Sequence, residues 1–188
     1  MTPETYLDIR RQVIDAGYCD EIQWQQNVKS PSTSEEFAWE AIWVILCIGM
    51  KEQIARKIQK KVETAINAGG SIDTVFGHKG KARAIASIWN RRKPLFEAFL
   101  SAPDKVEFCR SLPWIGNTTK YHLAKNLGVD TAKPDVHLIR VAEHFGTTPQ
   151  DLCSRISSGT GDRVATVDFV IWRACNLGII DSKNIQLS

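Results

Sequence analysis

Apolar residues recur every three or four positions along most of this chain, which is the spacing of one face of an α-helix. The segment Lys51–Ala68 shows the pattern most clearly, because basic residues fill the positions between the apolar ones. Its expected inner face holds Ile54, Ile58, Val62, Ala65 and Ile66, and its expected outer face holds Lys51, Arg56, Lys57, Lys60 and Lys61. Since no stretch shows the strong alternation of a strand, the pattern predicts an all-α fold of short helices joined by short loops.

The same spacing places helices on both sides of this segment. A first helix is expected from Thr2 to about Ala16, followed by a polar, irregular segment Gly17–Ser34 that contains Trp24. The buried stripe of the first helix is expected to be Leu7, Ile9, Val13 and Ile14. A helix capped by Ser34 is apolar almost all round and ends at Gly49, so it should lie in the core. Four tryptophans are also expected in the core: Trp39, Trp43, Trp89 and Trp172.

The stretch Leu112–Arg140 combines a tight apolar turn with two expected helices. Gly116 closes the turn and, lacking a Cβ, can adopt a positive φ or let another backbone approach. A helix should follow over Asn117–Leu127, and a second helix should be opened by Pro134 and Asp135. The first amides of a helix point outward from a positive dipole end, so an exposed turn of this kind can bind a phosphate.

These residues carry a resemblance to a known family. Leu112-Pro113-x-Ile115-Gly116, followed by Pro134-Asp135-Val136-His137-Leu138-x-Arg140, resembles the helix-hairpin-helix and Gly-Pro-Asp motif of base-excision DNA glycosylases. The resemblance implies a single two-lobed helical domain over residues 1–188, with the hairpin at about 103–127 and the catalytic helix at 134–145. It implies that Asp135 is the catalytic carboxylate and that backbone DNA contacts come from Gly116, Asn117, Thr118 and Thr119. It also implies a monovalent cation at the backbone carbonyls of Arg110, Leu112 and Ile115.

The sequence departs from that family at three points. Thr118 stands where strand-cleaving members carry a lysine, so a Schiff-base lyase reaction is not expected. Trp114 replaces the first hairpin glycine and adds a large ring near DNA, and Lys120 is counted with it among the expected DNA contacts. No four-cysteine cluster follows the motif, so no iron–sulfur cluster is expected.

A second resemblance bears on the reaction. Gly17-Tyr18-x-x-Glu21-Ile22-x-Trp24, Gly49-Met50-Lys51 and Phe76-Gly77-His78-Lys79-Gly80-Lys81 resemble the bacteriophage branch of this fold, which makes hypermodified thymines. That resemblance implies an enzyme that replaces pyrophosphate on 5-hydroxymethyluracil in DNA with an amino acid. The pyrophosphate would then contact Lys51, His78, Lys79 and Lys81. Two alternatives remain open: a monofunctional DNA glycosylase and a non-catalytic DNA-binding module.

Composition and the other candidate residues change this picture little. With 188 residues and a net charge of +3, the chain is long enough for a sizeable core but too weakly basic to indicate nucleic acid by charge alone. Five scattered cysteines without a CxxC pair indicate reduced thiols in a cytoplasmic protein. We expect a monomer whose partners are DNA and a free amino acid, with no membrane association. Glu36 and Glu40 lie on an apolar helix and could line an active site, and Trp24 could stack on a base.

Overall fold

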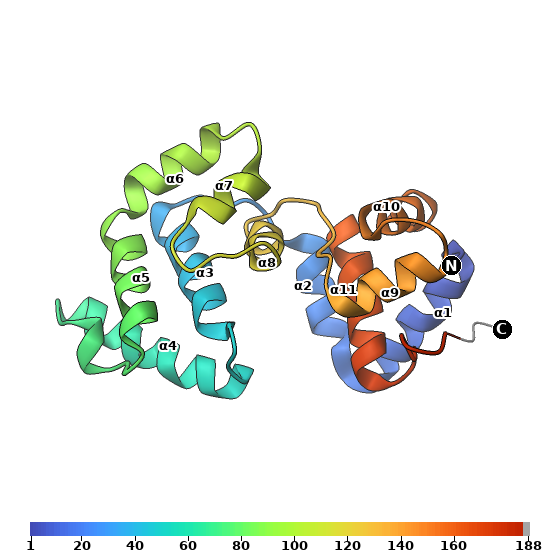
Figure 1. Ribbon diagram of the computed structural model, residues 1–188, viewed down its shortest axis with the longest axis horizontal. Helices are drawn as coiled ribbons and strands as arrows, with labels where there is room; N and C mark the ends of the chain where they lie inside the picture. Colours follow the sequence, from blue (N-terminus) through green and yellow to red (C-terminus); the bar gives the residue numbers. More distant parts are fainter. Residues whose placement is uncertain (186–188) are drawn as a thin grey trace. The chain divides into compact units, whose positions relative to one another are not determined.

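The computed structural model describes residues 1–185, which form helices and connecting loops without a β-strand (Figure 1). The all-α prediction is therefore confirmed. Contacts divide the chain into two compact units: unit 1 comprises residues 1–29 and 128–188, and unit 2 comprises residues 30–127. Within the described part of the chain, no helix has both the length and the apolar character needed to cross a membrane.

Unit 1 is built around α11 (Val164–Leu177), whose inner residues from Val164 to Ala174 are mostly buried. Helices from both chain segments of the unit pack on α11 (Figure 1). The helices that contact it are α1 (Pro3–Val13), α2 (Cys19–Asn27), α9 (Val136–His144) and α10 (Pro149–Thr160). Threonine side chains cap α1 and α10, each with a proline in the first turn, so local sequence fixes both helix starts.

The N-terminal segment differs from the prediction. Residues Ile14–Tyr18 form a π-helical turn, η1, in which Gly17 has a φ of 95°, and the chain continues directly into α2. The expectation of an irregular Gly17–Ser34 segment is therefore wrong for most of its length. A helix start at Cys19 was hard to foresee, because no side chain caps α2. Leu7, expected in the buried stripe, is 43% exposed.

Unit 2 is built around α3 (Ser34–Cys47), which contacts four other helices of the unit. Its neighbours are α4 (Glu52–Asn67), α5 (Lys79–Asn90), α6 (Arg92–Ser101) and α8 (Thr119–Asn126); a short 3-10 turn, η2 (Ile72–Thr74), and α7 (Lys105–Ser111) complete the unit (Figure 1). Phe37 on α3 lies 5.5 Å from Phe99 and 6.4 Å from Phe108, measured between ring centroids. This aromatic cluster joins α6 and α7 to the central helix.

Several expected core positions of unit 2 lie nearer the surface. The cap of α3 is Thr33 rather than Ser34, and its hydroxyl accepts a hydrogen bond from the Glu36 N–H at 3.1 Å. Ile54 is 49% exposed, because α4 turns only a narrow stripe containing Ala55 and Val62 inward. The four tryptophans expected in the core, one of them in unit 1, are each only partly buried.

One arginine organises the place where the chain leaves and re-enters unit 1. Arg163 Nη1 donates to the carbonyls of Gln25 and Val28 at 3.1 and 3.0 Å, and Nη2 donates to the carbonyl of Gly128 at 2.8 Å. Gln26 accepts from the Arg163 N–H at 2.9 Å. A single guanidinium thus joins the two segments of unit 1 near the points where the chain leaves that unit and returns to it.

Candidate nucleic-acid interface and catalytic carboxylate

Charge is distributed unevenly between the two units. Unit 2 holds 15 Lys and Arg residues against 9 Asp and Glu residues, a net charge of +6. Unit 1 holds 9 against 12, a net charge of −3. The small net charge of the whole chain therefore conceals a distinctly basic unit, and a basic unit is the electrostatic requirement for binding a phosphate backbone.

The expected hairpin turn lies in unit 2 between α7 and α8, which pack against each other. Within the turn, the Ile115 N–H donates to the Leu112 carbonyl at 3.2 Å. The residue with a positive φ is Trp114, at 70°, and not Gly116, for which a positive φ was one of two expected roles. A left-handed conformation costs a residue with a Cβ about 1–2 kcal/mol, so the surrounding packing must hold Trp114 in place.

The packing around Trp114 is tight on one side and open on the other. A Cβ placed on Gly80 would lie 2.8 and 2.9 Å from two carbon atoms of the indole ring, so a larger residue there would displace the ring. The His78 ring meets the indole edge-on, with 5.3 Å between centroids. Trp114 is nevertheless 43% exposed. The turn therefore presents a fixed aromatic ring to solvent beside the start of α5.

The residues after the turn keep part of the expected phosphate cradle. Gly116, Asn117 and Thr118 are exposed, and Thr118 occupies the N-cap position of α8 without a side-chain hydrogen bond to the helix. The Gly116 N–H is already bonded, because it donates to Thr119 Oγ1 at 2.7 Å. The helix begins at Thr119, two residues later than predicted. The amides after Gly116 are thus the ones placed to meet an anion.

Two lysines predicted to contact DNA or phosphate have structural partners instead. Lys120 is 8% exposed and its ammonium pairs with the Glu107 carboxylate on α7. Lys81 is 4% exposed, and its ammonium donates to the carbonyls of Leu46 and Ile48 at the end of α3. Burial lowers the pKa of Lys81. Each contact joins two different helices, which is why the periodicity of a single helix could not reveal it.

The other expected phosphate contacts remain accessible. Lys51 is exposed at the N-cap position of α4, and Lys79 is exposed in the first turn of α5. His78 is exposed too, but its Nδ1 caps α5 by accepting from the Lys81 N–H at 3.3 Å. Of the four residues predicted to meet pyrophosphate, two lysines therefore keep a free ammonium among the described residues.

The cation site expected at Arg110, Leu112 and Ile115 is partly engaged. The Leu112 carbonyl accepts from the Ile115 N–H, although a carbonyl oxygen has a second lone pair for a cation. Arg110 directs its side chain toward Glu107, with 3.7 Å between nitrogen and oxygen. Across residues 1–185, no cluster of three or more His, Cys, Asp or Glu side chains is arranged to hold a metal ion.

Asp135 lies in unit 1 at the N-cap of α9, as its position after Pro134 predicted. Its Oδ1 accepts hydrogen bonds from the N–H groups of His137 and Leu138, both at 3.0 Å. No hydrogen bond to Oδ2 is present among the described residues. The helix therefore fixes the orientation of the carboxylate while leaving one oxygen available.

A second acid holds the loop that precedes this carboxylate. Asp168, 2% exposed on α11, accepts from the Lys133 N–H at 3.0 Å, and the Lys133 carbonyl accepts from the Asp135 N–H at 2.8 Å. Asp168 was not predicted as a site residue. The sequence does hold an indication of its role, because Asp168 is an acidic residue among valines and a phenylalanine on an otherwise apolar helix. An unpaired carboxylate there would be costly, so a partner is expected.

The remaining side chains near Asp135 complete its surroundings. Burial raises the pKa of the Cys175 thiol to about 11, and the negative charges of Asp135 and Asp181 add to this effect. His137 Nδ1 and the Ser182 hydroxyl are 2.9 Å apart, which ties the C-terminal turn to α9. Asp135 thus belongs to a cluster of side chains from α9, α11 and the final turn.

The two glutamates weighed as active-site residues lie in unit 2 and have local partners. Glu36 accepts from the N–H and the hydroxyl of Ser32 at 2.7 and 2.9 Å, which stabilises the start of α3. Glu40 accepts from Asn126 Nδ2 at 3.0 Å, and burial raises the pKa of its carboxyl group. Trp24 is 44% exposed on α2, so its ring is accessible as predicted.

No family model matches the chain, and neither the curated proteins nor the solved structures contain a match.

Proposed function

We propose that this protein is an enzyme that binds DNA through unit 2 and acts on an extruded base with Asp135. The observation that carries the proposal is the basic character of unit 2 combined with its exposed turn, where Trp114 stands beside the free start of α8. Such a turn contacts backbone phosphate without reading base sequence. A base within a duplex must leave the stack before its atoms can be reached.

Asp135 supplies the chemistry in this proposal. Its Oδ1 is occupied by two helix amides, so Oδ2 is the atom that would face the reacting nucleotide. A carboxylate held in one orientation can accept a proton from an attacking nucleophile or stabilise a developing positive charge. Backbone binding alone needs no carboxylate, since phosphates repel it.

The reaction that we favour is amino-acid transfer to DNA. The amine of the amino acid attacks the methylene carbon attached to C5 of the uracil ring. The bond from that carbon to the pyrophosphate oxygen breaks, pyrophosphate leaves with the electron pair, and Oδ2 accepts the amine proton. From the predicted phosphate-binding set, Lys51 and Lys79 remain exposed in unit 2 as cations that a pyrophosphate group could bind.

Monofunctional base excision is the second candidate, and one observation favours it. Lys81 is committed to the end of α3, so the charge available for a pyrophosphate leaving group is smaller than the sequence indicated. Base excision needs no such charge. In that reaction Asp135 would stabilise the cationic sugar and orient water, and Thr118 would leave the enzyme without lyase activity.

The experiment presents both kinds of substrate to the purified protein. One arm contains DNA with pyrophosphorylated 5-hydroxymethyluracil and labelled glycine or serine, and the other contains uracil, alkylated or oxidised bases. Label in DNA supports the transferase, and released free base supports the glycosylase. DNA binding without either product would leave only a binding module.

A matched pair of substitutions tests the role of the carboxylate. Asp135→Asn keeps an N-cap side chain but removes the proton acceptor, so activity should be lost while DNA binding persists. Asp104→Asn makes the same change at the N-cap of α7, where Oδ1 accepts from the Glu107 N–H, and should leave activity intact. Equal losses in both variants would refute a catalytic role for Asp135.

A further inference from the structure

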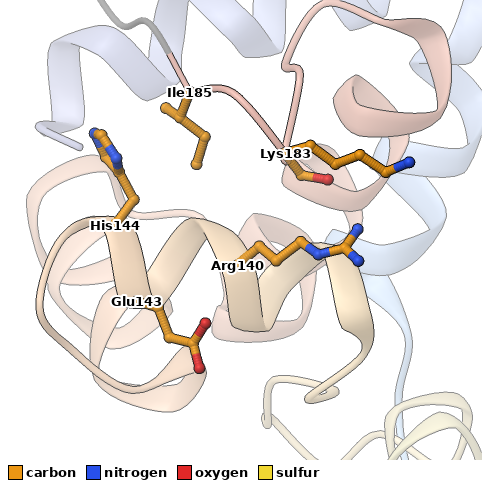
Figure 2. A pocket seen from close by; sticks show the side chains of 6 residues that line it. Arg140, Glu143, His144, Lys183 and Ile185 are labelled. Carbon is orange, nitrogen blue, oxygen red and sulfur yellow. The ribbon is translucent and has the colours of Figure 1, made fainter.

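Unit 1 contains a cavity that the proposed function does not use. It has a volume of about 330 Å³ and lies between the second half of α9 and the C-terminal turn (Figure 2). Small-molecule sites commonly have volumes from about 300 Å³ upward. Its lining residues are Arg140, Glu143, His144, Ser182, Lys183 and Ile185.

The two cations of this cavity differ in their surroundings, because the charge of Lys183 acts on the neighbouring Asp181 carboxylate and helps to lower its pKa. Arg140 is partly buried, and no acceptor pairs with its guanidinium among residues 1–185. The Lys183 ammonium also lacks a hydrogen-bond partner within that range. Figure 2 shows both cationic groups extending to the same side of the cavity, while the Glu143 carboxylate points elsewhere. Two neighbouring cations repel each other unless an anion lies between them.

The C-terminal turn holds Lys183 in this position. The Asp181 carboxylate accepts from the Lys183 N–H at 2.9 Å and from Asn184 Nδ2 at 3.1 Å. Ser182, 8% exposed, lies against His137 of α9. The turn is therefore fixed to the helix that carries Arg140, which keeps both cations at one open hollow of the surface.

We propose that this cavity binds a small molecule through a singly charged oxyanion group held between Arg140 and Lys183. The charged lining residues Arg140, Lys183 and Glu143 sum to one net positive charge, and the neighbouring Asp181 carboxylate adds a negative charge, so a singly charged carboxylate is favoured over a phosphate dianion. A phosphodiester of DNA offers the same single charge. The net charge of −3 on unit 1 opposes a polyanion, so the small molecule is the occupant that charge favours.

The test is an NMR titration of the ¹⁵N-labelled protein with sodium acetate, at constant ionic strength set by chloride. Amide shifts that saturate at Ser182, Lys183 and His144 are expected. Arg140→Gln and Lys183→Gln should each weaken the affinity by about tenfold or more. Arg155→Gln removes an exposed arginine of α10 outside the cavity and should titrate like the wild type.

Three outcomes would overturn the proposal: no saturable shift, equal weakening in the Arg155 variant, or displacement of acetate by a short DNA duplex. The last result would assign the cavity to a phosphodiester. Thermal unfolding of each variant verifies that the protein remains folded. The titration contains no modified base and no Asp135 variant, so its outcome is independent of the proposed reaction.

Discussion

Lys81 offers the sharpest test of the structure, because the sequence and the fold assign it different roles. As a phosphate contact it would be dispensable for stability and needed for DNA binding. In the structure its ammonium donates to the Leu46 and Ile48 carbonyls, which lie at the end of α3 and have lost their helical partners. Lys81→Met keeps most of the side-chain volume and removes only the donor.

The expected loss follows from the two acceptors. Leaving a buried polar group without its partner costs about 1–3 kcal/mol. One of these bonds is buried and the other partly buried, so the loss should be about 2–4 kcal/mol. For a chain of this length, each kcal/mol corresponds to roughly 2–4 °C, which predicts a Tm lower by about 4–16 °C.

The burial of Lys81 also determines whether stability rises or falls with pH. Because burial lowers the pKa of Lys81, the folded protein holds this proton less tightly than the unfolded chain. The stability of the wild type relative to Lys81→Met should therefore rise as the pH approaches the ordinary lysine range. Chemical denaturation at several pH values measures this difference.

Lys79→Met is the matched control, since Lys79 is exposed two residues earlier on the same helix. It should change stability by less than about 0.5 kcal/mol and weaken DNA binding, with the slope of log K against log salt reduced by about one. Fluorescence anisotropy with labelled duplex DNA, recorded below both Tm values, compares the two variants. An unchanged Tm in Lys81→Met together with lost DNA binding would refute the structural role.

Three further predictions concern other parts of the fold. Gly80→Ala should push the Trp114 ring from its position, weakening DNA binding and shifting tryptophan emission, whereas Gly77→Ala, whose Cβ would meet nothing within 4 Å, should do neither. Glu40→Gln should raise the Tm at pH 7 and lose that gain near pH 4. Burial raises the pKa of the Glu40 carboxyl, so the folded state binds this proton more tightly than the unfolded chain does. The wild type therefore loses stability as the pH rises and Glu40 ionises. Tyr6→Phe removes a phenol that donates at 2.7 Å to the Asp162 carboxylate, and denaturant titration should show a loss of about 1–2 kcal/mol.

Helix periodicity and capping predicted most of the fold. The range Lys51–Ala68 matches α4 within one residue at each end, because its apolar stripe and the Gly69-Gly70 pair after it are local signals. The helix α2 was missed since it has few apolar residues and no capping side chain. Which apolar residues face inward was predicted less well, as Leu7 and Ile54 show, because this depends on neighbouring helices that are distant in sequence.

In the candidate site, too, features set by local sequence were predicted and features set by contacts between helices were not. The N-cap position of Asp135 and the exposure of Trp114 followed from local sequence. The sequence did not show that Lys81 and Lys120 bond to other parts of the protein, since each is paired with a group on another helix. A positive φ was one of the two roles considered for Gly116, because glycine is the usual residue for that conformation, whereas in the structure Trp114 adopts it with its indole ring packed over Gly80.

The double attachment made by Arg163 has a consequence for synthesis on the ribosome. Unit 2 is one continuous stretch, so it can fold as soon as it has emerged, whereas α1 and α2 must wait for the last third of the chain before they have α11 to pack on. Val28 and Gly128 are bonded to the same side chain. Removing residues 30–127 and joining the cut ends with a few glycines should therefore give a continuous chain that still folds as unit 1. In sequence, unit 2 is thus an insertion between the two segments of unit 1.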